Sequence, residues 1–523
     1  MNRTLTIAGA AALLMTLAGT SCTDPTVAPK STVTSANIFN DPNSYRAFLA
    51  KIYGGLIVTG QRGPDGNPDI SGIDEGFGEY LRLYWYLQEM PTDEAVIGWN
   101  DPGLPDLNTG TWGASNSMVN AMYYRVFYQV MLVNEFLRQS TDAKLDSRGQ
   151  TDATLRTNVH FYRAEARFLR ALSYWHGLDL FGNIPLVTEN DALGSTPPQQ
   201  ATRADLYAYV VSELNDIITQ LPPKGASTYG RATPEAAHLL LAKLYLNAGV
   251  YTGTTNYAGA LTEAQAVIAG GYTLDPSFVH NFQADNNTSP ELVFVAPQDG
   301  NNTQTWGGMT FLIHAGCGGS MSAANYGIDY CWGGYRMKQQ IYRLFAAGDT
   351  RASFFYTTGQ TDSVSDRGDF TKGIAAPKFT NKTSGGASGA QQGMVDTDFP
   401  IFRLADAYLI YAEANIRGGG GSGTTALGYL NLLRERAYGN TTADFAALPA
   451  VDTILAERGR ELLFEAQRRT DLVRFGVFSG GAYLWAWKGG VAGGSAIGAF
   501  RDLYPLPANE LIANPNLHQN PGY

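Results

Sequence analysis

The 523-residue chain is poor in the features that mark several large classes of protein. It has only three cysteines and six histidines, and no run of five or more basic residues. The net charge of −10 and the pI near 5.2 argue against nucleic-acid binding, because phosphates require clustered cations. Apart from the N-terminus, no uncharged apolar run is long enough to cross a bilayer as a helix. Nucleic acid is therefore not among the expected partners.

Short motifs of catalysis and nucleotide binding are also missing. The sequence contains no GxxxxGK[ST], no HExxH and no GxSxG pattern. Gly418, Gly420 and Gly423 do spell GxGxxG. That motif requires a preceding strand, and the residues before it have a helical pattern, so the sequence predicts a turn between two helices.

One segment imitates the start of a calcium-binding loop. Asp65, Asn67 and Asp69 have the spacing of the first three ligands. However, Ile70 stands where such a loop requires glycine, and Gly76 stands where it requires glutamate. We therefore predict no metal ion and no cofactor.

The N-terminus has the pattern of an export signal. Arg3 precedes the apolar run 5–18, which is too short to span a bilayer stably. The small residues 19–21 come directly before Cys22, as in a bacterial lipoprotein signal, where that cysteine is lipidated and becomes the first mature residue. Ordinary secretion with an incidental cysteine is the alternative. The predicted segments are a signal peptide at 1–21 and a lipidated, Pro-containing tether at 22–40.

Two cysteines remain if Cys22 carries lipid. Cys317 and Cys331 lie 14 residues apart in a Gly-rich region, and exported proteins meet an oxidising environment. We expect a disulfide between them, which would stabilise the fold by about 3 kcal/mol in the chain-entropy description. Two separate buried thiols are the alternative.

Helical periodicity dominates the rest of the chain. The expected helices cover 44–58, 117–138, 159–180, 205–221, 234–247, 257–269 and most of 402–474, with breaks at 418–423 and 439–450. The stretches 234–269 and 402–437 each resemble a tetratricopeptide repeat of about 34 residues. The sequence therefore predicts a mainly α protein, with a tetratricopeptide-repeat scaffold, long loop-rich insertions and few short strands.

One domain is expected to cover 41–523. Its helical repeats are placed at about 41–59, 117–270 and 401–476. The regions 60–116 and 271–400 are rich in Gly, Asn, Asp, Pro and Thr and predict loops. Long loops in a compact protein usually carry function, so the ligand is expected on their side.

Half of the residues from Glu457 to Arg474 are charged, and every cation among them is arginine. Arginine pairs with carboxylates through a planar fork, so the composition favours fixed ion pairs. An apolar stripe at helical spacing predicts one continuous helix, and its members are Leu455, Leu462, Leu463, Ala466 and Val473.

The carboxylates of this segment also suggest an active site. Glu457, Glu461 and Glu465 are four residues apart and would share a helix face, as glycoside hydrolysis or a di-metal centre could require. No histidine follows them at the spacing of a metal site. We therefore predict that they are structural and that their partners are Arg458, Arg460, Arg468 and Arg469.

The candidate ligand-binding chemistry is aromatic. Trp99, Trp306 and Trp332 lie in the predicted loops beside amide and carboxylate residues. A ring can cover the apolar C–H face of a sugar, while polar side chains bind its hydroxyls. The candidate residues are Trp99, Asn100, Trp306, Tyr326, Tyr330 and Trp332. The alternative is that each tryptophan fills a local loop core.

Several segments resemble the SusD/RagB family, in the order in which that family has them. They are TDEAVIGWND (92–101), AEARFLRALSYWHGLDLFGNIPLVTE (164–189), DFPIFRLADAYLIYAEAN (398–415), ERGRELLFEAQRRTDLVRFG (457–476) and LYPLPANELIANPNLHQNPGY (503–523). The lipoprotein-like start also fits, and the resemblance spans nearly the whole mature chain. The departures from the family's pattern are Gly19 in the lipidation site and the Gly-rich insertion at 418–423.

The resemblance implies a tetratricopeptide-repeat protein that is anchored by lipid in the outer membrane and faces the cell exterior. It implies no catalysis. Family members bind nutrients, mostly glycans, and deliver them to a SusC-type TonB-dependent transporter. We expect the same role here, with a glycan or oligosaccharide as ligand. A peptide-binding member of the family and a surface polysaccharide-degrading enzyme are the alternatives.

Overall fold

The computed structural model describes residues 35–60, 63–64, 68–192, 194 and 196–523. The predicted signal peptide, Cys22 and most of the tether lie outside these residues, as do Asp65 and Asn67 of the calcium-like segment. None of the helices in the described ranges combines the length and the apolar composition that a bilayer-spanning segment requires.

The chain divides into two compact units, Met1–Ser44 and Tyr45–Tyr523. The described part of the first unit contains the short helix α2 (Ser35–Ile38). A turn follows, in which the Asn43 amide donates a hydrogen bond to Asp41 Oδ1 at 2.9 Å. Helix α3 (Asn43–Gly54) begins at this turn.

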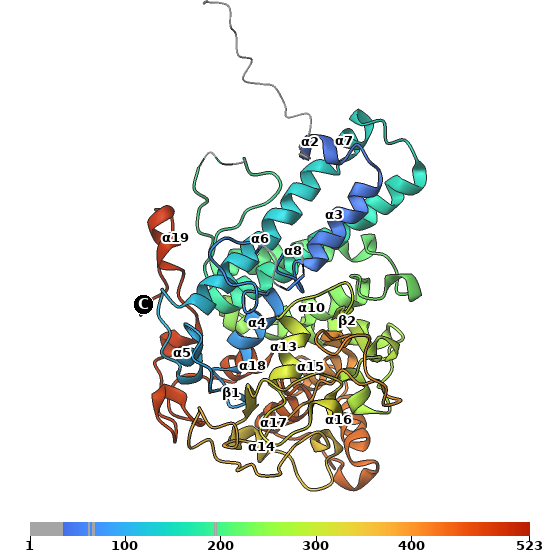
Figure 1. The fold of residues 1–523 in the computed structure, drawn as a ribbon. Coiled ribbons are helices and arrows are strands. Elements are labelled where there is room, and N and C mark those ends of the chain that lie inside the picture. Colours follow the sequence, from blue (N-terminus) through green and yellow to red (C-terminus); the bar gives the residue numbers. More distant parts are fainter. Residues whose placement is uncertain (1–34, 61–62, 65–67, 193, 195) are drawn as a thin grey trace, which may run out of the picture. The chain divides into compact units, whose positions relative to one another are not determined.

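A series of helices forms the scaffold of the second unit (Figure 1). They are α6 (Ser117–Gln139), α8 (Ala153–Phe181), α9 (Arg203–Ile217), α10 (Pro234–Leu246), α12 (Tyr257–Ala269), α15 (Leu404–Ile416) and α16 (Gly423–Tyr438). Each of them packs against the next in this order. The prediction of a mainly α, tetratricopeptide-like scaffold is confirmed.

Shorter elements complete the unit. The other helices are α4 (Tyr80–Glu89), α5 (Leu104–Thr109), α7 (Asp142–Ser147), α11 (Ala248–Thr252), α13 (Gly308–Ala315), α14 (Gln339–Tyr342), α17 (Val451–Glu461), α18 (Arg468–Arg474) and α19 (Ala508–Ala513). The strands β1 (Ala95–Ile97) and β3 (Tyr335–Met337) form an antiparallel pair with Ile97 opposite Tyr335. The strands β2 (Leu292–Ala296) and β4 (Phe399–Arg403) form a second antiparallel pair.

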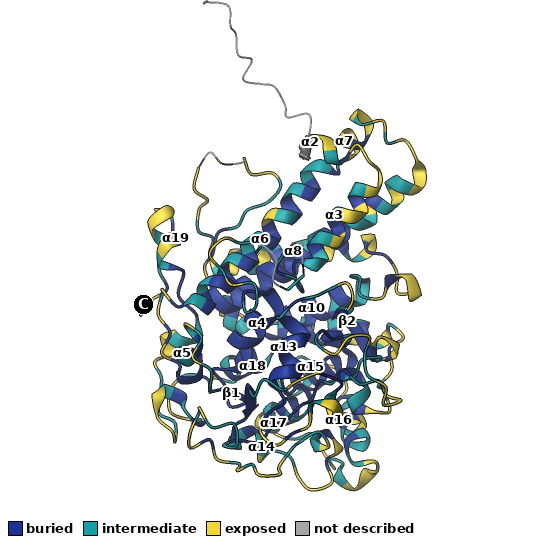
Figure 2. Ribbon diagram, viewed as in Figure 1, coloured by how far each residue is buried: buried dark blue, intermediate teal, exposed yellow. Residues whose placement is uncertain are grey.

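Helix α4 lies in a region where the sequence predicts loops. All ten of its residues are buried (Figure 2). Glu79 caps its N-terminus, since its carboxylate accepts hydrogen bonds from the amides of Leu81 and Arg82 at 2.9 and 2.7 Å. The sequence analysis missed this helix because the Gly-, Asn- and Asp-rich composition of the whole region 60–116 predicts loops, and the ten residues of α4 are a short part of it.

The continuous helix predicted across Glu457–Arg474 is wrong. Helix α17 ends at Glu461 and α18 begins at Arg468. The turn between them holds Phe464 and Ala466 at positive φ angles of 63° and 57°. Buried carboxylates bind this turn: the Phe464 amide donates to Glu94 at 2.7 Å, and the Gln467 amide donates to Glu89 at 3.0 Å.

The charged residues of this segment are themselves buried. Glu457 and Glu461 are fully buried, as are Leu462, Leu463 and Ala466 of the predicted apolar stripe, whereas Leu455 and Val473 are only half-buried. Ion pairing is confirmed, but most of the predicted partners are wrong. Of the four predicted arginines, only Arg460 pairs with one of the three glutamates, bonding Glu457 at 2.6 Å.

The actual partners come from other parts of the chain. Glu457 pairs with Arg351 and Arg434, Glu461 with Arg351, Arg403 and Arg436, and Glu465 with Arg403 and Lys378. Arg458 binds Asp406 and Asp471, Arg468 binds Asp93, and Arg469 binds Asp179. The segment therefore joins loops, strands and repeats that are distant in sequence, which local spacing cannot reveal.

Replacing Glu89 by glutamine is expected to stabilise the protein at pH 8 by about 1–3 kcal/mol and to change little near pH 5. Burial raises the pKa of Glu89 to about 7, so the folded protein keeps a proton that the unfolded chain releases. The Glu89 carboxyl contributes its full stabilisation below the pKa that it has in the unfolded chain. That contribution to the free energy of unfolding is lost as the pH rises toward 7. Urea unfolding at both pH values measures the difference.

The neutral side chain that Glu89→Gln introduces can still accept the Gln467 amide, so the turn should keep its geometry. Glu135→Gln, which changes a part-exposed carboxylate on α6, is the matched control and should shift stability by less than about 0.5 kcal/mol at either pH. If Glu89→Gln and the wild type keep the same pH dependence, the buried protonated carboxyl is not present.

Candidate functional site

The β1–β3 pair brings two of the predicted tryptophans together. Trp99 lies two residues beyond the end of β1, and Trp332 lies three residues before the start of β3. Because the strands are antiparallel, the end of β1 meets the start of β3. Gly334 permits the close approach, since a Cβ atom there would lie 2.8 Å from the Trp99 ring.

Four of the predicted residues form one group, which we call the aromatic cluster: Trp99, Trp306, Tyr330 and Trp332. Trp332 is central, with ring centroids 6.4 Å from Trp99, 6.2 Å from Trp306 and 6.3 Å from Tyr330. The planes of Trp99 and Trp306 are tilted from that of Trp332 by 47° and 57°. The three indoles are half-buried and Tyr330 is 52% exposed, so the rings remain partly accessible.

Helix α13 supports the cluster from below with residues three positions apart. Phe311 contacts Trp99 at a centroid distance of 6.1 Å, and His314 contacts Trp332 at 4.8 Å. His314 is fully buried, and burial lowers its pKa, so its ring is neutral at physiological pH. Its Nδ1 lies 2.9 Å from the Tyr330 carbonyl oxygen and donates to it, which links the helix to the loop that bears Tyr330.

Arg82 of α4 joins the walls of the site. Its guanidinium lies 4.4 Å from the Phe311 ring centroid and 5.9 Å from that of Trp99. It also donates hydrogen bonds to the carbonyl oxygens of Gly76 and Trp306 at 3.0 and 2.9 Å. The Arg82 side chain therefore holds the backbone of Trp306 and also contacts Phe311, the ring that packs against Trp99.

Glu79 links the two helices that carry this support. Besides capping α4, its Oε2 accepts the Gly308 amide at the start of α13 at 2.7 Å. Burial raises its pKa to about 7, against the hydrogen bonds from Arg82, Leu81 and Gly308. A Cβ on Gly307 would lie 2.4 Å from Glu79, so glycine is needed for this approach.

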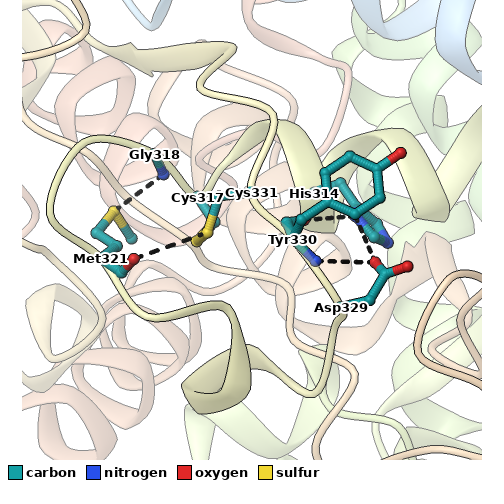
Figure 3. Close-up of a disulfide and its surroundings, with 7 residues drawn as sticks. All are labelled: His314, Cys317, Gly318, Met321, Asp329, Tyr330 and Cys331. Atoms are coloured by element: carbon teal, nitrogen blue, oxygen red, sulfur yellow. Dashed lines mark hydrogen bonds and ion pairs between the residues drawn. A yellow bond between two sulfur atoms is a disulfide. The ribbon is translucent and has the colours of Figure 1, made fainter.

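A disulfide closes the loop that carries Tyr330 (Figure 3), and Trp332 follows directly after its second cysteine. Cys317 and Cys331 are bonded, with Cα atoms 4.8 Å apart, as the sequence predicts. The Trp332 amide also donates to the His314 carbonyl at 2.9 Å, and the Gly333 amide donates to the Cys317 carbonyl at 2.8 Å. The bridge and these hydrogen bonds fix the loop against the end of α13.

Replacing both Cys317 and Cys331 by serine is expected to lower the free energy of unfolding by about 3 kcal/mol, because the unfolded chain regains the freedom of the closed loop. The loop in the folded state also loses a constraint, so we expect ligand affinity to fall several-fold. Urea unfolding and ligand titration measure the two effects. Adding reductant to the serine variant should change nothing, while the wild type should shift toward the variant.

Two predicted residues lie apart from the cluster. Tyr326 makes no ring contact with the tryptophans in the described structure; its carbonyl oxygen accepts the Asn381 amide at 2.9 Å. Asn100 is exposed, and its side chain forms no hydrogen bond within the described ranges. Conversely, sequence reasoning missed Arg82, Phe311 and His314, which have no distinguishing motif around them.

The predicted carboxylate alternative is not built as an open site. Glu457, Glu461 and Glu465 are at most 3% exposed and are held by the arginines described above. Across the described residues, no group of three or more His, Cys, Asp or Glu side chains is arranged to hold a metal ion. Unlike these carboxylates, the aromatic cluster is half-buried and partly open to solvent.

Known proteins with related sequences identify the family of this chain. Residues 347–523 match the SusD family. The chain is 35% identical to the Starch-binding protein SusD of Bacteroides thetaiotaomicron, over 91% of each chain. It is 27% identical to a SusD-like protein of Bacteroides ovatus, over 72% of this chain and 68% of that one. The chain belongs to the SusD family.

Solved structures share the fold. The Surface glycan-binding protein A of Bacteroides thetaiotaomicron, in complex with laminarihexaose, superposes with a TM-score of 0.69 at 20% identity, covering 91% of this chain and 98% of that one. A SusD superfamily protein of the same organism gives a TM-score of 0.71, covering 92% and 99%. At these identities the likeness concerns the fold alone.

Proposed function

We propose that this chain is a cell-surface glycan-binding lipoprotein that captures an oligosaccharide and passes it to a SusC-type TonB-dependent transporter in the outer membrane. The observation that carries the proposal is the aromatic cluster, in which three indoles lie side by side and partly exposed. Such faces bind the C–H surfaces of successive sugars, and neighbouring polar groups bind the hydroxyls. Lipid on Cys22 would supply the anchor.

The shape of the cluster favours a curved glycan. Tilts of 47° and 57° between neighbouring indoles mean that the three rings do not form one flat face, which fits a chain whose sugar faces turn from unit to unit. α-1,4-Glucans turn in this way, whereas β-1,4-glucans are nearly flat. The 35% identity to a starch-binding protein supports the same assignment, so we infer a starch-type α-glucan as the ligand.

Calorimetric titration with maltoheptaose, laminarihexaose, cellohexaose and a peptide library tests the ligand class. Maltoheptaose should bind at least 10-fold more tightly than cellohexaose. Preferential binding of peptides would replace the glycan assignment with the peptide-binding alternative. New reducing ends on incubation with starch would instead indicate an enzyme.

A further inference from the structure

Two adjoining cavities lie outside the aromatic cluster. The first, of about 570 Å³, is bordered by α3 and by the loops 227–231 and 297–303. The second, of about 700 Å³, lies beside β2 and the segment 224–230. Tyr229 and Gly230 line both, so the two cavities share this wall. Each is within the size range of small-molecule sites, and no residue of the aromatic cluster lines either.

The lining is rich in tyrosine. Tyr53 and Tyr162 border the first cavity, Tyr272 borders the second, and Tyr229, which is 38% exposed, borders both. Two of the nearby cations are already engaged. Arg231 Nε donates to Glu165 at 3.0 Å, and Lys224 Nζ lies 3.6 Å from the centroid of the Tyr272 ring. Arg46 and Asp299 also line the first cavity, and the Tyr53 and Tyr229 hydroxyls are bonded to Glu165 and Asp398. The tyrosine rings are therefore the main shared feature of the two cavities.

Asp398 holds the two walls in place. The Tyr229 hydroxyl donates to one of its carboxylate oxygens, and the backbone N–H of Gln298 donates to the other at 2.6 Å. Asp398 directly precedes β4, so both loops are tied to the β2–β4 pair. A groove with fixed walls loses less conformational entropy when a ligand binds.

One buried polar group in the groove has no partner within the protein. Gln298 lines the first cavity and is 8% exposed, and its Nε2 makes no hydrogen bond in the described structure. Buried polar atoms are almost always hydrogen-bonded. The Gln298 side chain therefore keeps a spare donor beside the cavity, and a hydroxyl of a bound chain is the kind of group that would accept from it.

We propose that the two cavities form a second carbohydrate-binding groove, which holds a neutral glycan chain too long for the aromatic cluster alone. The inference rests on the proposed function, since it assumes a glycan ligand. Tyrosine faces, with polar side chains beside them that can bind hydroxyls, are the chemistry that recognises such a chain. Thr303 lines the groove and Trp306 belongs to the aromatic cluster, so one loop borders both sites.

Ala50→Trp tests the groove without removing any contact. Ala50 is an exposed residue of α3 that lines the first cavity, so an indole there would fill it. Ala47 is exposed on the same helix, does not line either cavity, and gives the matched control Ala47→Trp. Both variants should keep the wild-type melting temperature.

The probes are maltoheptaose and amylopectin, measured with the full chain by titration and affinity electrophoresis. We expect Ala50→Trp to weaken amylopectin binding at least 5-fold and leave maltoheptaose unchanged, while Ala47→Trp changes neither. Identical behaviour of the two variants would overturn the groove. The double variant Trp99→Ala/Trp332→Ala tests the aromatic cluster separately and should lose binding of both maltoheptaose and amylopectin. If it binds both as tightly as the wild type, the proposed function is overturned instead. The glycan assignment of the groove would be overturned by a peptide whose binding is weakened by Ala50→Trp and is not competed by amylopectin.

Discussion

An Arg403→Met variant is expected to lose about 3–5 kcal/mol of unfolding free energy. Arg403 is 1% exposed and bonds Glu291, Glu461 and Glu465, each at 2.7 Å. Methionine fills much of the same volume but leaves the three buried carboxylates without their shared cation. Breaking a buried ion pair on one side is costly because the remaining charge stays desolvated.

The loss should depend on pH. Burial alone would raise the pKa of Glu461, but Arg436, Arg403 and Arg351 outweigh it and hold this pKa well below its usual range. A depressed carboxylate pKa stabilises the fold above the unfolded pKa, and the benefit is lost as the pH falls. Removing Arg403 weakens this depression, so the stability gap between wild type and variant should be largest at neutral pH and should narrow progressively below about pH 5.

Urea unfolding at pH 7 and pH 4 measures both effects. The matched control is Arg343→Met, because Arg343 pairs with Asp362 at the surface, where the two side chains are 64% and 38% exposed. That change should cost less than about 1 kcal/mol. If Arg403→Met were as mild as Arg343→Met, the buried network would not hold the repeats to the strands.

The sequence predicts the scaffold where local signals and amphipathic period coincide. Helix α12 has the predicted bounds, and α10 begins at Pro234 as its Thr-Pro start indicates. Helix α8 begins at Ala153, six residues before the predicted start, because Asp152 caps it through the Leu155 amide at 2.6 Å. The polar first turns of α8 carry no apolar period, so only the cap marks them.

Prediction fails where tertiary contacts replace the local pattern. Helix α4 is buried all round, and the turn after α17 depends on Glu89 and Glu94, which lie more than 360 residues away in sequence. No window of the sequence contains both the turn and its partners. The buried arginines show the same limit, because their composition indicates fixed ion pairs but not the distant carboxylates with which they pair.

The candidate site also contains residues that the sequence reveals and residues that it does not. Large aromatic residues beside amides in a loop are visible in the sequence, and the structure brings Trp99, Trp306 and Trp332 together. The residues that orient them are not visible, because Arg82 and His314 acquire their roles only when α4 and α13 meet beneath the loops. The grouping itself follows from the antiparallel pairing of β1 with β3, a non-local feature.

Replacing Trp99 and Trp332 together by alanine is expected to weaken maltoheptaose binding at least 30-fold. Aromatic anchors at the centre of a binding surface each contribute about 2 kcal/mol or more, and 1.4 kcal/mol corresponds to a factor of ten. The double change removes the central ring and one neighbour, so most of the aromatic surface is lost. Titration calorimetry measures the affinity, and circular dichroism checks that the helical scaffold is retained.

Phe500→Ala is the control, because this ring is 37% exposed and lies outside the aromatic cluster. Its loss should leave affinity within about 2-fold, as expected for a surface residue that does not touch the ligand.

The three single tryptophan variants should differ in how much affinity they lose. Trp332 contacts both other indoles, so Trp332→Ala should cost more affinity than Trp99→Ala or Trp306→Ala. Equal losses would mean that the three rings bind independently, and an unchanged double variant with a native fold would move the ligand away from this cluster.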